Sequence, residues 1–165
     1  MRLPTLLSSD KLTIYLNDHL AGSTVGLELA RRALGENRGT EFETVLNELA
    51  GEIAEDRDEL GSILDLLAIP RDRFKVAAGW IGEKLGRVKL NGQRTGYSPL
   101  SRLLELEGLS AGVRAKRDLW RALREIAPGE PRLDQDRLER LIARADSQLE
   151  RLATVQARAA VLAIG

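Results

Sequence analysis

The sequence predicts an all-α fold, a four-helix bundle built from two antiparallel helical hairpins. The composition favours long helices, because Leu, Ala, Arg and Glu dominate and only 4% of the residues are aromatic. Apolar residues recur at alternating spacings of three and four along four stretches, as in helices that pack lengthwise on one another. Turn-forming segments at 35–39 and 128–131 each join two of these stretches. We expect one helical-bundle domain, 1–165.

The first helix is predicted over residues 10–34. Ser9 or Asp10 can cap its start, and Gly35 with the turn after it ends the helix. The inward-facing positions of a helix are called its seam below. The seam of this helix is mostly apolar, with the hydroxyl of Ser23 near its middle.

The second helix is predicted over residues 41–69. Thr40 and Glu43 form the T-x-x-E pattern of a capping box, and Pro70 cannot continue a helix. Its seam is apolar except for Asp56, which lies in the middle. The outer face is strongly acidic, and its acidic residues are Glu41, Glu43, Glu48, Glu52, Glu55, Asp58, Glu59 and Asp65.

The connection that follows is long and basic. It contains a predicted short helix, 73–88, and an irregular loop at 91–97. A short link, a long crossover and a second short link describe two hairpins joined along the length of a bundle. A simple up-and-down bundle with five helices is the alternative.

The third and fourth helices are predicted over residues 99–127 and 134–163. Ser98 and Pro99 form a typical helix start, with an N-cap serine and a proline in the first turn. Asp134 is the expected cap of the fourth helix. Lys116 and Gln148 interrupt the two apolar seams near their centres.

With this plan, the chain resembles the ferritin-like superfamily of four-helix bundles. The segments LNDHLAGS (16–23) and LLELEGL (103–109) are similar to stretches in small bacterial proteins described as ferritin-like or of unknown function. The resemblance implies a bundle with a helical crossover. Active members of this superfamily bind two metal ions at mid-bundle through glutamates and two Glu-x-x-His motifs.

The ligands for such a metal pair are missing from the sequence. The chain has one histidine, His19, and no Glu-x-x-His. We therefore expect no cofactor and no metal site of the usual kind. An atypical site would have to draw on His19, Glu28, Glu52, Glu55 and Asp56. A half-exposed histidine on the first helix is the simpler interpretation of His19.

A different layer is predicted where the superfamily holds its metals. The seams place Ser23, Asp56, Lys116 and Gln148 near the middle of their helices. An unpaired buried charge is costly, so Asp56 and Lys116 should meet, with Ser23 and Gln148 completing their hydrogen bonds. The expected role is to fix the register between helices. The alternative is that either charged residue rotates off the seam into solvent.

Composition limits the classes of partner. The formal charge is zero, so no global field attracts nucleic acid or an anionic membrane. The chain has no cysteine and no apolar run of about 20 residues that could span a bilayer. We expect a cytoplasmic protein. The acidic second helix and the basic residues of the crossover and third helix should neutralise each other, within one molecule or across a dimer.

Three functions follow from these observations. We favour a non-catalytic bundle that acts as an interaction or scaffold module. Residues 152–164 are rich in apolar side chains, which predicts a homodimer, with a helix end buried under the crossover as the alternative. The other two functions are a di-iron-type oxidoreductase with atypical ligands and a binder of a small apolar ligand between the helices.

Overall fold

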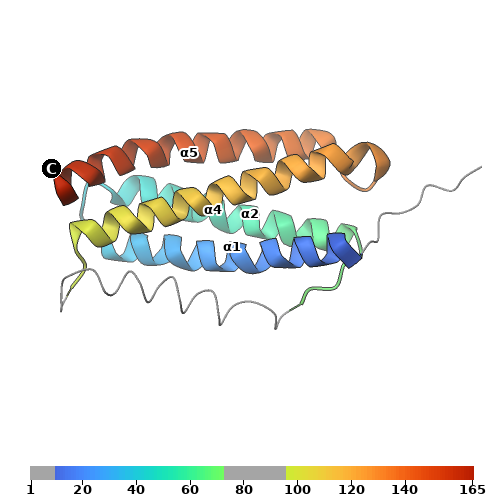
Figure 1. Cartoon of the computed structure of the whole chain (residues 1–165), viewed down its shortest axis with the longest axis horizontal. Helices are drawn as coiled ribbons and strands as arrows, with labels where there is room; N and C mark the ends of the chain where they lie inside the picture. The colour runs from blue at the N-terminus through green and yellow to red at the C-terminus, as the bar shows by residue number, and fades with distance from the viewer. Residues whose placement is uncertain (1–9, 73–95) are drawn as a thin grey trace, which may run out of the picture.

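The computed structural model describes residues 10–72 and 96–165, and within these ranges it contains four long α-helices. They are α1 (Asp10–Glu36), α2 (Glu43–Leu66), α4 (Pro99–Ile126) and α5 (Gln135–Ile164), with a short 3-10 turn, η1 (Ala127–Gly129), after α4. The predicted all-α four-helix bundle is confirmed (Figure 1). The predicted helix 73–88 lies outside the described residues.

The capping residues predicted for α4 and α5 are confirmed. The Ser98 hydroxyl accepts a hydrogen bond from the backbone N–H of Ser101 at 3.0 Å. The Asp134 carboxylate accepts from the N–H groups of Asp136 and Arg137, at 2.9 and 3.2 Å. Both caps satisfy helix N–H groups that have no partner inside the helix.

The predicted ends of the first two helices need correction. α1 continues two residues past 34, and α2 begins at Glu43, two residues after 41. In the turn before α2, the Thr40 hydroxyl donates to the Asn37 carbonyl at 2.7 Å and accepts from the Phe42 N–H at 3.2 Å. Glu43 accepts from the Gly39 N–H at 2.7 Å. α2 ends three residues before 69, because Ala68 adopts a left-handed conformation (φ 55°) and turns the chain.

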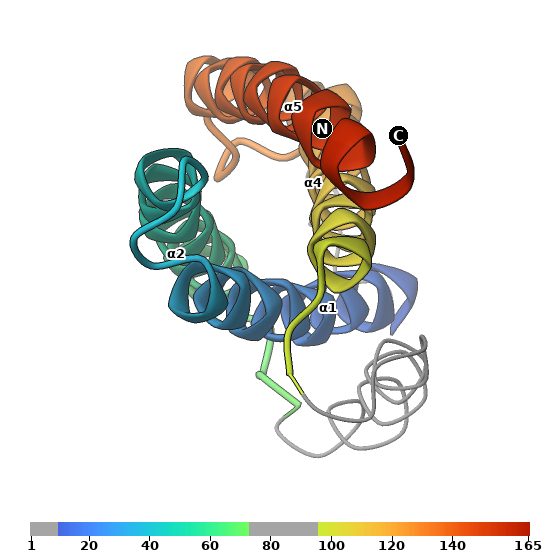
Figure 2. The same ribbon diagram turned by 90° about the vertical axis from the view of Figure 1, so that its left-hand side faces the viewer.

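The four helices form a ring in which each neighbour runs antiparallel to the next. Viewed end-on, the order around the ring is α1, α2, α5, α4 (Figure 2). α2 ends and α4 begins at opposite ends of the bundle (Figure 1), so the connection between the hairpins has to span its length. This arrangement is the predicted pair of hairpins joined by a long crossover, and it differs from an up-and-down bundle.

The apolar core is divided into two clusters, one toward each end of the bundle. Along α2, Ile53 belongs to one cluster and Leu60 to the other, with buried Asp56 between them. Along α4, Val113 and Leu119 are divided in the same way. A polar layer therefore lies between the two halves of the core. None of the helices within residues 10–72 and 96–165 is both long and apolar enough to cross a membrane.

Candidate functional site in the middle of the bundle

Asp56 is the centre of the polar layer. Its side chain is 1% exposed, and both of its carboxylate oxygens accept hydrogen bonds from other helices. Lys116 of α4 and Gln148 of α5 donate to Oδ2, the amide at 3.1 Å. Arg144 of α5 donates to Oδ1 through Nε at 2.8 Å and also through Nη2. The buried carboxylate is thus fully compensated by protein groups.

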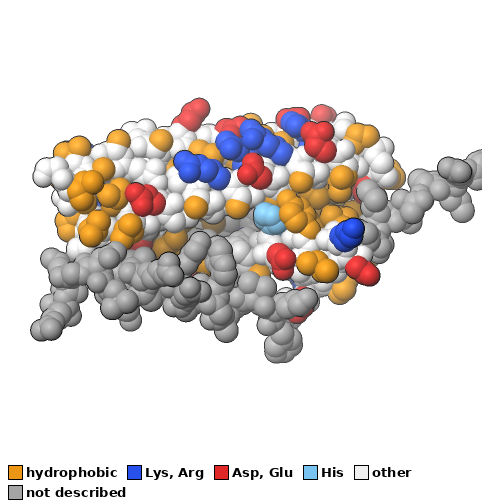
Figure 3. Space-filling view, viewed as in Figure 1, with side chains coloured by type: hydrophobic (Ala, Val, Ile, Leu, Met, Phe, Trp, Pro, Cys, Tyr) orange, Lys and Arg blue, Asp and Glu red, His pale blue; other side chains and the backbone are white. Residues whose placement is uncertain are grey.

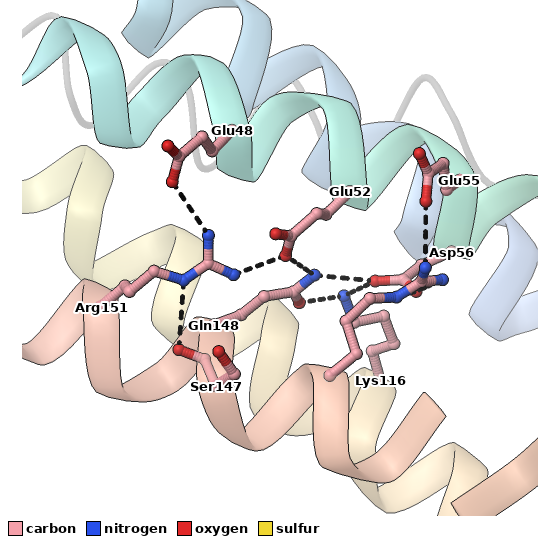
Figure 4. A network of polar contacts seen from close by, with 9 residues as sticks. Glu48, Glu52, Glu55, Asp56, Lys116, Ser147, Gln148 and Arg151 are labelled. Atoms are coloured by element: carbon pink, nitrogen blue, oxygen red, sulfur yellow. Dashed lines mark hydrogen bonds and ion pairs between the residues drawn. The ribbon is translucent and has the colours of Figure 1, made fainter. Parts of the chain in front are cut away.

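Gln148 bridges the charged groups around Asp56 (Figure 4). Its carbonyl oxygen accepts from the Lys116 ammonium at 2.5 Å, and its amide donates to Glu52 at 2.9 Å as well as to Asp56. Burial lowers the pKa of Lys116, and the adjacent Asp56 carboxylate opposes part of that shift. Because an amide offers both a donor and an acceptor, one residue satisfies a cation and two carboxylates.

The layer continues along the bundle as a series of ion pairs between α5 and α2. Four arginines of α5 are spaced seven residues apart. Three of them reach carboxylates of α2, and the fourth, Arg158, reaches Glu41 just before α2 begins. Arg158 bonds both oxygens of Glu41 at 3.1 Å. The remaining pairs are Arg151 with Glu48 and Glu52, Arg144 with Glu55 and Asp56, and Arg137 with Glu59. We call these four arginines and their partners the arginine ladder.

The ladder has a fixed register. Two steps of seven residues along α5, from Arg158 to Arg151 to Arg144, are matched by steps of seven from Glu41 to Glu48 to Glu55. The last step, to Arg137, is matched by the four residues from Glu55 to Glu59. Seven residues rise by about 10.5 Å in an α-helix, so the pairs line up without adjustment. A shift of α5 by one turn would separate them. The ladder therefore specifies how α2 and α5 pair.

Glu52 links the arginine ladder to the buried layer around Asp56. It accepts from Arg151 at 2.6 Å and from Gln148 at 2.9 Å (Figure 4). Partial burial alone would raise the pKa of Glu52, but these two hydrogen bonds and the charges of Arg151 and Arg144 outweigh burial and lower it. The carboxylate form is therefore favoured by its surroundings.

The structure brings together three of the four residues predicted for the polar layer. The predicted contact between Asp56 and Lys116 is present, and Gln148 joins it. Ser23 does not take the predicted role, because its hydroxyl donates to the Leu20 carbonyl of its own helix at 2.6 Å. Helical serines commonly form such local bonds. Arg144 supplies the contacts that had been assigned to Ser23.

Arg144 and the ladder were missed by the sequence interpretation. That interpretation matched the acidic face of α2 with basic residues of the crossover and of α4. Arg71 of the crossover does pair with Asp65 of α2 at 2.6 Å, but Glu48, Glu52 and Glu55 pair with arginines of α5. On α4, Arg117 and Arg124 instead pair with Asp146 and Glu139 of α5. Figure 3 shows basic and acidic side chains interspersed where α4 and α5 run. The matching seven-residue spacings of Arg and Glu could have identified the ladder.

The residues of the atypical metal site are not brought together. Glu28 pairs with Arg31 on the exposed face of α1, and His19 contacts the Tyr15 ring edge-on at 4.7 Å between ring centroids. Glu52 and Glu55 are engaged by arginines on the far side of the ring. Within residues 10–72 and 96–165, no three His, Asp or Glu side chains are grouped as they would be to hold a metal ion.

A second buried carboxylate, Glu105, lies between α4 and α1. Its side chain is inaccessible to solvent, and it accepts a hydrogen bond from the Tyr97 hydroxyl at 2.8 Å. Arg32 approaches its other oxygen at 3.0 Å. Burial raises the pKa of Glu105, although the Tyr97 bond and the Arg32 charge oppose the shift. Asn37 donates to the same tyrosine oxygen at 3.0 Å, so the group ties the start of α4 to the end of α1.

The charged groups of the mid-bundle layer are paired with one another. Every carboxylate in it accepts from an arginine, lysine or glutamine, so its negative charges are paired within the protein. Such a network orients helices and specifies their register. No family model matches the chain, and no curated protein or solved structure was found to be significantly similar to it.

Proposed function

We propose that this protein is a non-catalytic bundle of the ferritin-like plan that acts as an interaction or scaffold module. The observation that carries the proposal is the compensation of Asp56 by Lys116, Arg144 and Gln148 at the centre of the bundle. In active bundles of this plan, two metal ions occupy that depth. Here an ammonium and a guanidinium supply the positive charge.

Iron loading tests the absence of a metal centre. The purified chain is incubated with ferrous iron without oxygen, desalted, exposed to air, and assayed for iron and for oxo-bridge absorption. We expect no stoichiometric iron and no absorption band. Retention of about two irons per chain, as in di-iron bundles, would overturn the proposal and favour the atypical oxidoreductase.

We propose a second copy of the chain as the first partner to test. Apolar side chains gather at the end of the molecule where α5 terminates (Figure 3), and Val161 and Ile164 are 62% and 73% exposed. An exposed apolar cluster favours association. The balanced formal charge gives no comparable reason to propose nucleic acid or a membrane as partner, and a cytoplasmic location remains our expectation. The apolar ligand site also stays a prediction.

Sedimentation velocity tests self-association. We expect the wild-type chain to sediment as a dimer and the variant with Val161→Glu and Ile164→Glu to sediment as a monomer. Ile14→Glu is the matched control, since Ile14 is 51% exposed but lies at the other end of the bundle. A wild-type monomer, or equal effects of both changes, would contradict a dimer through α5.

A further inference from the structure

One of the four helix interfaces differs from the others. The backbones of α1 and α2, of α4 and α5, and of α1 and α4 approach each other closely at many positions. Those of α2 and α5 come close at few positions, and long arginine and glutamate side chains span the distance between them. The α2–α5 interface is therefore held to an unusual degree by polar contacts.

Water and salt can reach most of these contacts. The Arg158–Glu41 pair is half-exposed on both sides, and Arg151 is 27% exposed against a Glu48 that is 55% exposed. Exposed ion pairs contribute little to stability and are weakened by screening. The outer rungs of the ladder are consequently sensitive to ionic conditions, and few close backbone contacts support the interface that they span.

The buried contacts of Asp56 do not make the α2–α5 interface as hard to separate as an apolar one. Separating Asp56 from Lys116 and Arg144 breaks strong contacts but returns three charged groups to water, and hydration recovers much of that cost. Separation of an apolar interface has no such compensation. Behind the ladder, Leu49, Ile53 and Leu152 belong to the apolar core and keep the closed form dominant.

The α1–α4 interface, on the opposite side of the ring, is closely packed. Leu29 of α1 packs so closely on Gly108 of α4 that a Cβ atom there would lie 3.1 Å from its methyl group. Glu105 of α4 is held near Arg32 of α1 and is buried. This α1–α4 contact can act as the hinge side of the bundle.

We infer that the bundle opens at the α2–α5 interface, with hairpins α1–α2 and α4–α5 separating there while the α1–α4 contact holds. Screening or loss of the arginine ladder raises the population of the open form. Opening presents core residues such as Leu49, Ile53 and Leu152 to solvent, so ionic conditions control access to the core. The inference is independent of the proposed scaffold role.

Distances between spin labels test the inference, and the absence of native cysteine makes site-specific labelling simple. One doubly labelled protein carries Asn47→Cys on α2 and Glu150→Cys on α5, both at exposed positions beside the ladder. A second carries Glu28→Cys on α1 and Ala111→Cys on α4, at exposed positions on the hinge side. Pulsed EPR is recorded at low salt and at about 1 M salt, where the Debye length is about 3 Å.

We expect salt to increase the long-distance component of the α2–α5 pair and to leave the α1–α4 pair unchanged. The change Arg151→Gln with Arg158→Gln should raise the open-to-closed ratio roughly 3- to 150-fold at low salt, as expected for the three ion pairs that these arginines make with Glu41, Glu48 and Glu52. Arg114→Gln with Arg121→Gln is the control of equal charge, on an exposed part of α4.

Two results would overturn the inference. An α2–α5 distance that responds neither to salt nor to loss of Arg151 and Arg158 would mean that the interface does not open. Equal broadening for both label pairs would mean that the bundle unfolds as a whole.

Discussion

Arg144 and Asp56 meet at the middle of the bundle, where two nitrogens of the guanidinium donate to the same carboxylate oxygen, Oδ1. The other oxygen is left for Lys116 and Gln148. The third guanidinium nitrogen donates to Glu55 at 3.0 Å, so Arg144 joins the buried layer to the exposed ladder. One arginine thus links the core of the bundle to its surface.

Replacing Arg144 should destabilise the fold more than replacing any exposed arginine nearby. Arg144→Gln leaves the buried Asp56 with one cation instead of two, and we expect a loss of about 1.5–3 kcal/mol in unfolding free energy. Urea unfolding measures the loss. The control is Arg140→Gln, at an exposed position one turn earlier, which should stay within about 0.5 kcal/mol of wild type. Equal effects would contradict the role of Arg144.

Exchanging the charges of Glu41 and Arg158 tests the outermost ion pair of the ladder. Glu41→Arg and Arg158→Glu should each destabilise the bundle, because each places like charges where an ion pair lies in the native chain. The double variant restores the pair in reverse and should recover most of the loss. A coupling energy of about 0.2–1 kcal/mol is expected from a double-mutant cycle in low salt. Additive losses would show that the two side chains do not interact.

Acidification should weaken the Glu52 contacts only at pH values below the ordinary pKa of glutamate. Because its folded pKa lies below the ordinary value of 4.5, the Glu52 contacts stabilise the fold above that pH and lose their effect as pH falls through the lowered pKa. Urea unfolding from pH 7 to pH 3 should therefore show a shallower acid-induced loss of stability for Glu52→Gln than for wild type. An unchanged slope below pH 4.5 would contradict the assigned contacts.

Glu105 should show the opposite sign and a different pH range. Its folded pKa is raised above 4.5, so its charged form is penalised at higher pH and the penalty disappears as pH falls from the raised pKa toward 4.5. Wild type gains stability from this group on acidification, and Glu105→Gln should lack that gain. The same urea series measures it. A change of the same sign in Glu105→Gln and Glu52→Gln would refute one of the two assignments.

The cap of α5 gives a local prediction. Asp134→Ala removes the acceptor for two helix N–H groups and should cost about 0.5–2 kcal/mol. Thermal unfolding measures the change. Ser147→Ala, at an exposed position in the middle of the same helix, is the control and should be close to neutral. A neutral Asp134→Ala would mean that the cap contributes nothing to α5.

The helices were predictable because their signals are local. Seam spacing, Ser98 with Pro99, and Asp134 each depend on residues within one or two turns. The end of α2 was not predicted correctly, since nothing in the sequence marks Ala68 for a left-handed conformation. The meeting of Asp56 with Lys116 could be anticipated because two opposite charges interrupt apolar seams at the same depth.

The partners on α5 were harder to predict, for a physical reason. Seam analysis finds residues that point into the core, whereas the arginines of the ladder lie at its edge and reach inward with long side chains. Their partner helix depends on the order of helices around the ring, which local patterns do not determine. Ser23 was assigned to the layer by depth alone, although its hydroxyl is satisfied within α1.

The account depends most directly on the coupling between Asp56 and Lys116, and a double-mutant cycle measures it. The proteins are wild type, Asp56→Asn, Lys116→Met and the double variant, each unfolded in urea at neutral pH. We predict that the double variant loses less stability than the sum of the single variants, with a coupling energy of about 0.5–3 kcal/mol. Strictly additive losses would contradict a compensated buried pair at the centre of the bundle.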